Sequence, residues 1–230
     1  MDLQQWIKTD RSKFAKKRET IRARLSGQTG ILDHIAEENK EDIFYMLMFC
    51  LLVPRSDQKL ADAATNILRK NDFYAQKIEE KTLSTLLRGK ARFHNVEARR
   101  IVYARHVFLE TSFWDDLKDK FEAYQRADQA GKVRTRNRIL LTTRTWLDSK
   151  IDGMSMKGAS HFMRNVGMRG LAVLDAQVRQ AVKDRFDMGN PGDPMSRDEY
   201  YLMEQKVKEY AEETGIVLDE LGLLWSNSSK

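Results

Sequence analysis

The stretch Lys150-Ile-Asp-Gly-Met-Ser-Met-Lys-Gly-Ala159 decides the fold, because its residues favour a tight turn between two helices. Gly153 lets the backbone turn and approach a partner closely, and the small Gly158 and Ala159 allow two helices to pack tightly. We therefore predict a helix-hairpin-helix over residues of about 146–167. Such a hairpin presents backbone N–H groups and a helix N-terminus, which bind a phosphate without recognising a base.

Apolar residues recur at helical spacing along nearly the whole chain on both sides of this hairpin. The run 43–53 is apolar on all sides, which is typical of a helix buried inside a bundle. No alternating strand pattern is longer than a few residues, so we predict an all-α fold, with residues 1–230 as one domain. The expected helices cover residues 1–24, 41–53, 57–70, 94–109, 112–128, a basic segment from Gly131 to about Lys150, 157–167, 176–186 and 196–225.

Local signals predict where several of these helices begin and end. Gly27 and Gly30 are expected to end the first helix. Ser196 and Glu199 have the spacing of a capping box, which predicts a helix that starts there and continues to about residue 214. The segment 189–194, Gly-Asn-Pro-Gly-Asp-Pro, is the clearest loop in the chain.

Composition excludes several classes of protein. Hydrophobic residues make up 41% of the 230 residues and charged residues 32%, which are values of a globular chain. The single cysteine, Cys50, excludes an intrachain disulfide and favours a reducing compartment. One cysteine and four histidines without clustered spacing make a zinc or iron–sulfur site unexpected, and no cofactor is predicted. The apolar run at 43–53 is shorter than the roughly 20 residues that span a bilayer, so we expect a cytoplasmic or nucleoid location without a membrane partner.

Positive charge is unevenly distributed. The formal net charge is +6, but residues 8–24 and 132–138 are strongly basic, whereas 198–220 is acidic. Clustered positive charge is typical of proteins that bind a polyanion. Arg134 and Arg136 in the second cluster are therefore candidate DNA contacts. A solvated helix face is the alternative interpretation of either cluster, and both interpretations stay open.

Lys157 and Asp175 are the candidate catalytic residues. Lys157 follows the turn and begins the second helix of the hairpin, and Asp175 lies 18 residues further along the chain, after a helix and a glycine-containing turn. An amine can attack a sugar carbon, and a carboxylate can accept its proton and stabilise positive charge that develops on the sugar. As alternatives, Lys157 could contact a phosphate, and Asp175 could be the N-cap of the helix 176–186.

The residues Met154-Ser-Met-Lys-Gly-Ala-Ser-His-Phe-Met-Arg-Asn-Val-Gly167 resemble a signature of the helix-hairpin-helix DNA glycosylase superfamily. The resemblance is strongest to the archaeal-type, second branch of the 8-oxoguanine DNA glycosylase/AP lyases, whose aspartate segment is similar to Ala172-Val-Leu-Asp175. Weaker similarity covers most of the chain, including the segments 54–59 and 92–95.

This resemblance implies a fold of two helical subdomains with the hairpin at the cleft between them. It implies that Lys157 forms a Schiff base with the sugar, that Asp175 is the catalytic carboxylate, and that the damaged base is flipped into a pocket. The imine then leads to β-elimination, which cuts the strand 3′ to the lesion. The implied partner is double-stranded DNA that contains damaged guanine, bound by a monomer. Further implied DNA contacts are Gly153, Ser155 and Arg164.

The chain departs from the family pattern at three places, one of which is its short tail, Trp225-Ser-Asn-Ser-Ser-Lys230. Ser155 stands where the hairpin of the family has its second glycine, and Ala176-Gln177 stands where the family usually has arginine and histidine, so Gln177 is a candidate DNA contact of a different kind. Near the C-terminus the family is expected to hold the base with a tryptophan and a terminal lysine. Trp225, Lys230 and the aromatic Phe93 are therefore candidate base-recognition residues.

Two alternative functions remain. A non-catalytic helix-hairpin-helix module would bind duplex DNA in a salt-sensitive way without releasing a base. A glycosylase for another damaged base would have weak lyase activity.

Overall fold

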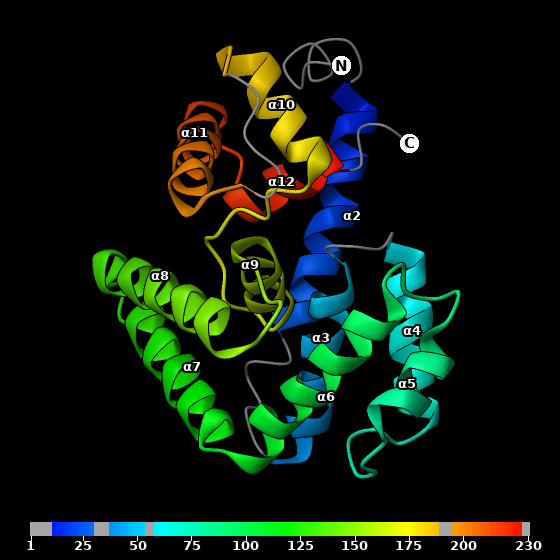
Figure 1. Cartoon of the computed structure of the whole chain (residues 1–230). Coiled ribbons are helices and arrows are strands. Elements are labelled where there is room, and N and C mark those ends of the chain that lie inside the picture. Colours follow the sequence, from blue (N-terminus) through cyan, green and yellow to red (C-terminus); the bar gives the residue numbers. More distant parts are fainter. Residues whose placement is uncertain (1–10, 30–36, 54–57, 189–194, 227–230) are drawn as a thin grey trace. The chain divides into compact units, whose positions relative to one another are not determined.

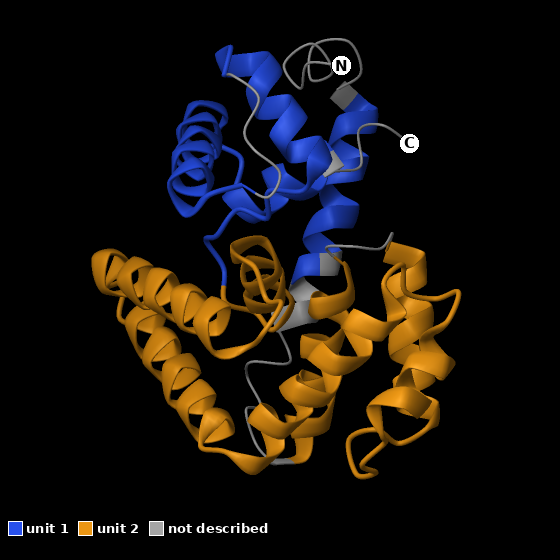
Figure 2. Cartoon of the chain, viewed as in Figure 1, with its two compact units in different colours: residues 1–30, 169–230 blue, residues 31–168 orange. Residues whose placement is uncertain are grey.

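The computed structural model describes residues 11–29, 37–53, 58–188 and 195–226, and these residues form helices and turns without a strand (Figure 1). The all-α prediction is thus confirmed for the described part of the chain. The chain divides into two compact units, in agreement with the two helical subdomains expected from the sequence. Residues 1–30 and 169–230 form unit 1, and residues 31–168 form unit 2 (Figure 2). None of the described helices is long and apolar enough to cross a membrane.

Unit 2 is built around the apolar helix α3 (Lys40–Leu52), whose eight buried residues include Phe44, Leu47 and Cys50. Phe44 contacts the ring of Phe108 with 5.4 Å between the ring centroids, and its ring centroid lies 6.1 Å from that of Phe73. The predicted buried helix is therefore the centre of this unit. The surrounding elements are η2 (Glu37–Asn39), α4 (Gln58–Lys70), α5 (Glu80–Leu87), α6 (His94–Glu110), α7 (Phe113–Gln129), α8 (Val133–Lys150) and α9 (Met156–Asn165).

Unit 1 contains α2 (Arg11–Thr29), α10 (Ala176–Phe186), α11 (Arg197–Thr214) and α12 (Leu218–Ser226). The end of α2 differs in part from the prediction, because the helix continues through Gly27 and ends at Thr29, directly before Gly30. A glycine inside a helix costs only about 0.5–1 kcal/mol, which does not by itself terminate a helix. The first ten residues, the start of the predicted first helix, lie outside the described residues.

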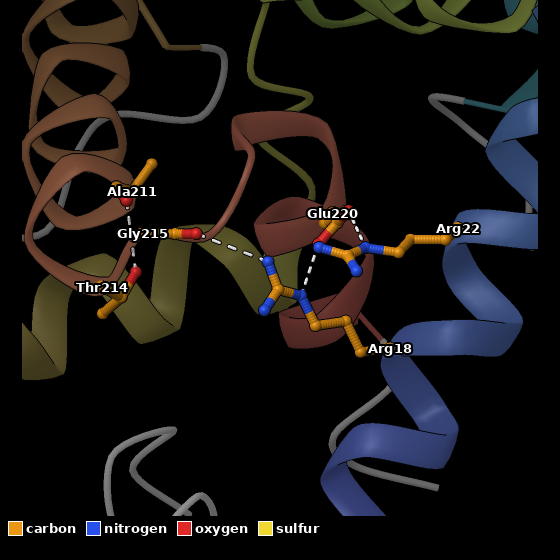
Figure 3. A network of polar contacts seen from close by, with 6 residues as sticks. All are labelled: Arg18, Arg22, Ala211, Thr214, Gly215 and Glu220. Carbon is orange, nitrogen blue, oxygen red and sulfur yellow. Dashed lines mark hydrogen bonds and ion pairs between the residues drawn. The ribbon is translucent and has the colours of Figure 1, made fainter.

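Part of the N-terminal basic cluster holds unit 1 together. Arg18 and Arg22 of α2 both donate through Nε to the carboxylate of Glu220 in α12, at 2.7 and 2.6 Å (Figure 3). Arg18 also donates to the carbonyl oxygen of Gly215 at 3.4 Å. The Glu220 side chain is only 6% exposed. These two arginines therefore pair with a carboxylate inside unit 1. Neither interpretation of the basic cluster, a surface that binds a polyanion or a solvated helix face, predicted this role.

The helix ends in unit 1 follow the local signals. The Ser196 hydroxyl accepts from the Glu199 N–H at 3.2 Å, and a Glu199 carboxylate oxygen accepts from the Ser196 N–H at 2.7 Å, so the predicted capping box is present at the start of α11. This helix ends at Thr214, with Gly215 at a φ of +62° as its C-cap. The predicted loop 189–194 lies outside the described residues.

Candidate active site

The predicted hairpin joins α8 to α9. The N–H of Ile151 donates to the Leu147 carbonyl at 3.1 Å and ends α8, and the N–H of Met154 donates to the Ile151 carbonyl at 3.0 Å and closes the turn. Gly153 has a φ of +83°, in the left-handed region that favours glycine. The tight turn that Gly153 predicted is thus present, and α9 begins directly after it at Met156.

Ser155 has a defined structural role at the start of α9. It is the N-cap of this helix, and its hydroxyl accepts from the Gly158 N–H at 3.2 Å. Its φ of −109° and ψ of 167° are extended values that any L-residue adopts. The departure from the glycine of the family therefore introduces no backbone strain, and the serine supplies a cap that glycine lacks.

Lys157 occupies the second position of α9, where its side chain is half-buried. A helix N-terminus carries partial positive charge, which opposes a protonated amine there by roughly 0.3–1 kcal/mol. The helix that carries Lys157 is held in place by its neighbours. A methyl group on Gly158 would lie 3.3 Å from the backbone oxygen of Cys50 in α3, so α9 approaches α3 as closely as a glycine permits.

A buried arginine ties α8 to α9. Arg144 is fully buried, and its Nη1 donates to the Ser160 hydroxyl at 3.2 Å, one helical turn beyond Lys157. Arg144 is not among the residues predicted from the sequence. It lies between Leu140 and Leu147 on the buried face of α8, and a lone arginine on an apolar stripe is the signal that could have found it.

Arg164, a predicted DNA contact, lies inside unit 2 with only 7% of its surface exposed. Burial raises the pKa of the Cys50 thiol, and the positive charge of Arg164 opposes that rise. A phosphate contact requires a donor at the surface, so the burial of Arg164 conflicts with its predicted role as a DNA contact. Next to it, the Asn165 amide lies 3.3 Å from the Met46 sulfur.

Asp175 is the N-cap of α10. Its Oδ1 accepts from the N–H groups of Gln177 and Val178, at 3.0 and 2.9 Å. The capping role considered from the sequence is therefore observed. Because Gln177 takes part through its backbone, the cap does not depend on which side chain stands at this position. Lys157 belongs to unit 2 and Asp175 to unit 1.

The two predicted arginine contacts lie at the start of α8. Arg134 is exposed. Arg136 is less exposed, with 29% of its side chain accessible, and its guanidinium pairs with Asp128 at 2.9 Å. Arg134 therefore presents its charge to solvent, whereas part of the Arg136 charge is offset within unit 2.

The candidate base-recognition residues have contrasting environments. Phe93 is 51% exposed at the start of α6, and the guanidinium carbon of Arg92 lies 5.4 Å from the centre of its ring. Trp225 is only 5% exposed and stacks on Tyr210, with 5.3 Å between the ring centroids and 13° between the planes. Its place is the core of unit 1, a packing role that the sequence did not predict. Lys230 lies outside the described residues.

No group of three or more histidine, cysteine, aspartate or glutamate side chains in the described part of the chain could hold a metal ion. The hairpin itself offers the Lys157 amine at a helix N-terminus, the backbone of the turn at Gly153 and the exposed lysine Lys150.

The chain is similar to several known proteins and solved structures. The 8-oxoguanine DNA glycosylase/AP lyase of Saccharolobus solfataricus is 34% identical over 140 residues, which are 61% of this chain and 58% of that protein. The protein of the same name from Korarchaeum cryptofilum is 27% identical over 217 residues, 94% of this chain and 90% of that one. The crystal structure of the Methanocaldococcus jannaschii 8-oxoguanine glycosylase/lyase in complex with a 15mer DNA containing 8-oxoguanine has the same fold, with a TM-score of 0.72, 21% identity, and coverage of 99% of this chain and 96% of that one.

The model of the family described as 8-oxoguanine DNA glycosylase, Ogg-HhH, matches residues 30–216, which include the hairpin, Lys157 and Asp175. Because this match covers most of the 230 residues, the chain belongs to the helix-hairpin-helix 8-oxoguanine DNA glycosylase family.

Proposed function

We propose that this protein is a base-excision repair enzyme that removes 8-oxoguanine from DNA and then cuts the strand as an AP lyase. The observation that carries the proposal is the position of Lys157 in the first turn of α9, directly after the tight turn at Gly153. Backbone N–H groups of that turn would bind a phosphate of the damaged strand. The amine of Lys157 would then lie on the same rigid element that holds the DNA backbone.

In the first chemical step, the Lys157 amine attacks C1′ of the damaged nucleotide, and the base leaves with the electron pair of the glycosidic bond. Asp175 stabilises the positive charge on the sugar and accepts a proton from the amine. The bond between C1′ and the ring oxygen O4′ then breaks, O4′ takes up the proton that Asp175 accepted, and the Schiff base forms between the lysine nitrogen and C1′. Loss of a proton from C2′ then breaks the bond between C3′ and its oxygen, which cuts the strand on the 3′ side of the lesion.

Borohydride reduction of the Schiff base tests the nucleophile. The parent protein is expected to form a covalent complex with a duplex that contains 8-oxoguanine, and Lys157→Gln to form none. Lys150→Gln is the matched control, because Lys150 is an exposed lysine at the other end of the same hairpin. Persistent trapping by Lys157→Gln would overturn the assignment of the nucleophile.

The capping geometry of Asp175 allows its chemistry to be separated from its structural role. Asparagine is as good an N-cap as aspartate, so Asp175→Asn keeps the two bonds from the Gln177 and Val178 N–H groups but removes the carboxylate charge. We expect base excision to fall at least about a hundredfold, with stability unchanged within about 0.5 kcal/mol. Excision at the parent rate by this variant would leave Asp175 with the capping role alone.

A strand-cleavage assay separates the alternative functions. Cleavage of an 8-oxoguanine duplex without alkali indicates a glycosylase with lyase activity. Cleavage only after hot alkali indicates an 8-oxoguanine glycosylase with weak lyase activity. If the 8-oxoguanine duplex is not cleaved under either condition, a panel of duplexes with other damaged bases tests for a different substrate. No cleavage of any of these duplexes, together with salt-sensitive binding, would indicate a non-catalytic DNA-binding module. From the DNA substrate we further infer that the protein acts at the nucleoid.

A further inference from the structure

Arg100 of α6 lies directly against the hairpin turn. A methyl group placed on Gly153 would be 2.5 Å from Cδ of Arg100 and 2.6 Å from its Nε, closer than real side chains approach. The stem of this arginine therefore fills the space that the missing side chain of Gly153 leaves. Arg100 is distant from the hairpin in the sequence and was not among the candidate site residues.

The guanidinium of Arg100 lies between two carboxylates. Nη1 is 3.5 Å from Oε1 of Glu97, one turn earlier in α6, and Nε is 3.8 Å from Oδ2 of Asp152 in the turn. The Glu97 side chain is only 2% exposed and that of Asp152 is 56% exposed. The Nε atom is buried and has no hydrogen-bond partner among the described residues. Charge attraction, and not a tight hydrogen-bonded pair, thus links Arg100 to the turn.

This placement matters because Asp152 is part of the turn that would bind a phosphate. A carboxylate beside a phosphate site repels the ligand, and Glu97 adds a second negative charge nearby. Arg100 is the cation that the structure places within 4 Å of both carboxylates. Without Arg100, the exposed carboxylate of Asp152 would present its negative charge to the DNA backbone without this cation beside it.

We propose that Arg100 is a positioning residue of the hairpin, which covers Gly153 and neutralises Asp152 so that the turn can accept a DNA phosphate. This proposal rests on the proposed function, because it assumes that the hairpin binds DNA. It assigns Arg100 an effect on DNA binding that acts through the turn, and it predicts that the effect depends on the charge of Asp152.

The test is a double-mutant cycle on the full chain, measured as binding to a short labelled duplex that carries a tetrahydrofuran abasic-site analogue, which contains no glycosidic bond to cleave. Arg100→Ala is expected to weaken binding about tenfold, equivalent to about 1.4 kcal/mol. In the Arg100→Ala/Asp152→Asn double variant, affinity is expected to return to within about threefold of the parent, because the carboxylate that Arg100 neutralised is gone.

Arg99 provides the matched control. It is an exposed arginine on the same helix, one residue earlier, and its side chain points about 100° away around the helix axis. Arg99→Ala is expected to change affinity by less than about twofold, as is usual for one solvent-exposed charge. Equal losses for Arg99→Ala and Arg100→Ala would show that only total charge matters, which would overturn the proposal.

The rescue distinguishes this role from a merely structural one. If Arg100 only stabilised the fold, or contacted the phosphate itself, the Asp152→Asn change would not restore binding, and a double variant as weak as Arg100→Ala would overturn the proposal. Asp152→Asn alone keeps the test decisive if Arg100→Ala fails to fold, because this exposed side chain can be changed without unfolding the protein. It should bind DNA as tightly as the parent or more tightly, and weaker binding would contradict the proposed repulsion. If the parent and Lys157→Gln both fail to bind the duplex, the proposed function itself is wrong.

Discussion

Replacement of Gly158 by alanine tests how closely the helix of Lys157 is packed. Gly158 is buried in α9, immediately after Lys157. The added methyl group would lie 2.9 Å from the Met154 sulfur and 3.3 Å from the backbone oxygen of Cys50. The methionine side chain can move aside, but the Cys50 carbonyl is main chain in the last turn of α3 and moves only with the backbone there.

Two opposing effects decide the magnitude. Alanine is favoured over glycine inside a helix by about 1 kcal/mol. Insertion of an extra methyl group into a tightly packed interface costs about 1–3 kcal/mol. A shift of α9 would also weaken the bond from the Gly158 N–H to the Ser155 hydroxyl, whose full loss costs about 1 kcal/mol. We therefore expect Gly158→Ala to destabilise unit 2 by about 1–2 kcal/mol.

Gly222→Ala in α12 is the matched control. A methyl group at Gly222 would meet no atom within 4 Å, so only the helix propensity changes. This variant should gain up to about 1 kcal/mol. The two glycine-to-alanine changes are thus expected to shift stability in opposite directions, with a difference of about 1–3 kcal/mol.

The assay is urea unfolding of the parent and both variants at pH 7, followed by circular dichroism, with equal slopes required before midpoints are compared. Borohydride trapping of the folded variants adds a second measurement, because a displaced α9 would also displace the Lys157 amine. If Gly158→Ala were stabilised as much as Gly222→Ala, the close approach of α9 to α3 would be refuted.

Three further predictions follow from single side chains. Ser155→Ala should destabilise the protein by about 1 kcal/mol and Ser155→Gly by only a few tenths, because glycine is tolerated at an N-cap; equal losses in urea unfolding would contradict the cap at Ser155. Glu220→Gln should lower the free energy of unfolding by about 1–2 kcal/mol, because the ion pairs with the two partly exposed arginines Arg18 and Arg22 are lost. An unchanged unfolding midpoint would mean that α2 docks without these ion pairs. The raised pKa of the buried Cys50 keeps its proton in the folded state, so its contribution to stability is complete below about pH 8.5 and is lost as the pH rises further. Above that pH the free energy of unfolding of the parent should fall by about 1.4 kcal/mol per pH unit more than that of Cys50→Ala. If the free energies of unfolding of the two proteins fell in parallel with pH, this linkage would be excluded.

Local sequence signals predicted most helices and their ends, because they depend on neighbouring residues. The apolar run of α3 and the capping box at Ser196 and Glu199 involve residues within a few positions of one another. The errors have local causes as well. Gly27 was given more weight than its small helix penalty justifies, and α5, Glu80–Leu87, is too short for its apolar periodicity to be distinctive.

Residues that support the site from a distance could not be predicted in the same way. Glu220 is separated from Arg18 by 202 positions, and a basic cluster in the sequence carries no sign of the acid that will meet it. Arg100 likewise reaches the turn at Gly153 from another helix. In both cases the sequence shows an arginine that looks exposed, and only the packing of helices shows the carboxylate that it faces.

The two interpretations of Asp175 from the sequence, N-cap and catalytic carboxylate, are compatible in the structure. Both capping bonds end on Oδ1, so the cap does not need the second oxygen of the carboxylate. The cap also fixes the orientation of the carboxylate at the start of α10, and a fixed orientation is what a catalytic group requires. A short polar residue at an N-cap is therefore no evidence against catalysis. The cap explains why aspartate or asparagine is favoured at this position, and only the catalytic role requires the negative charge.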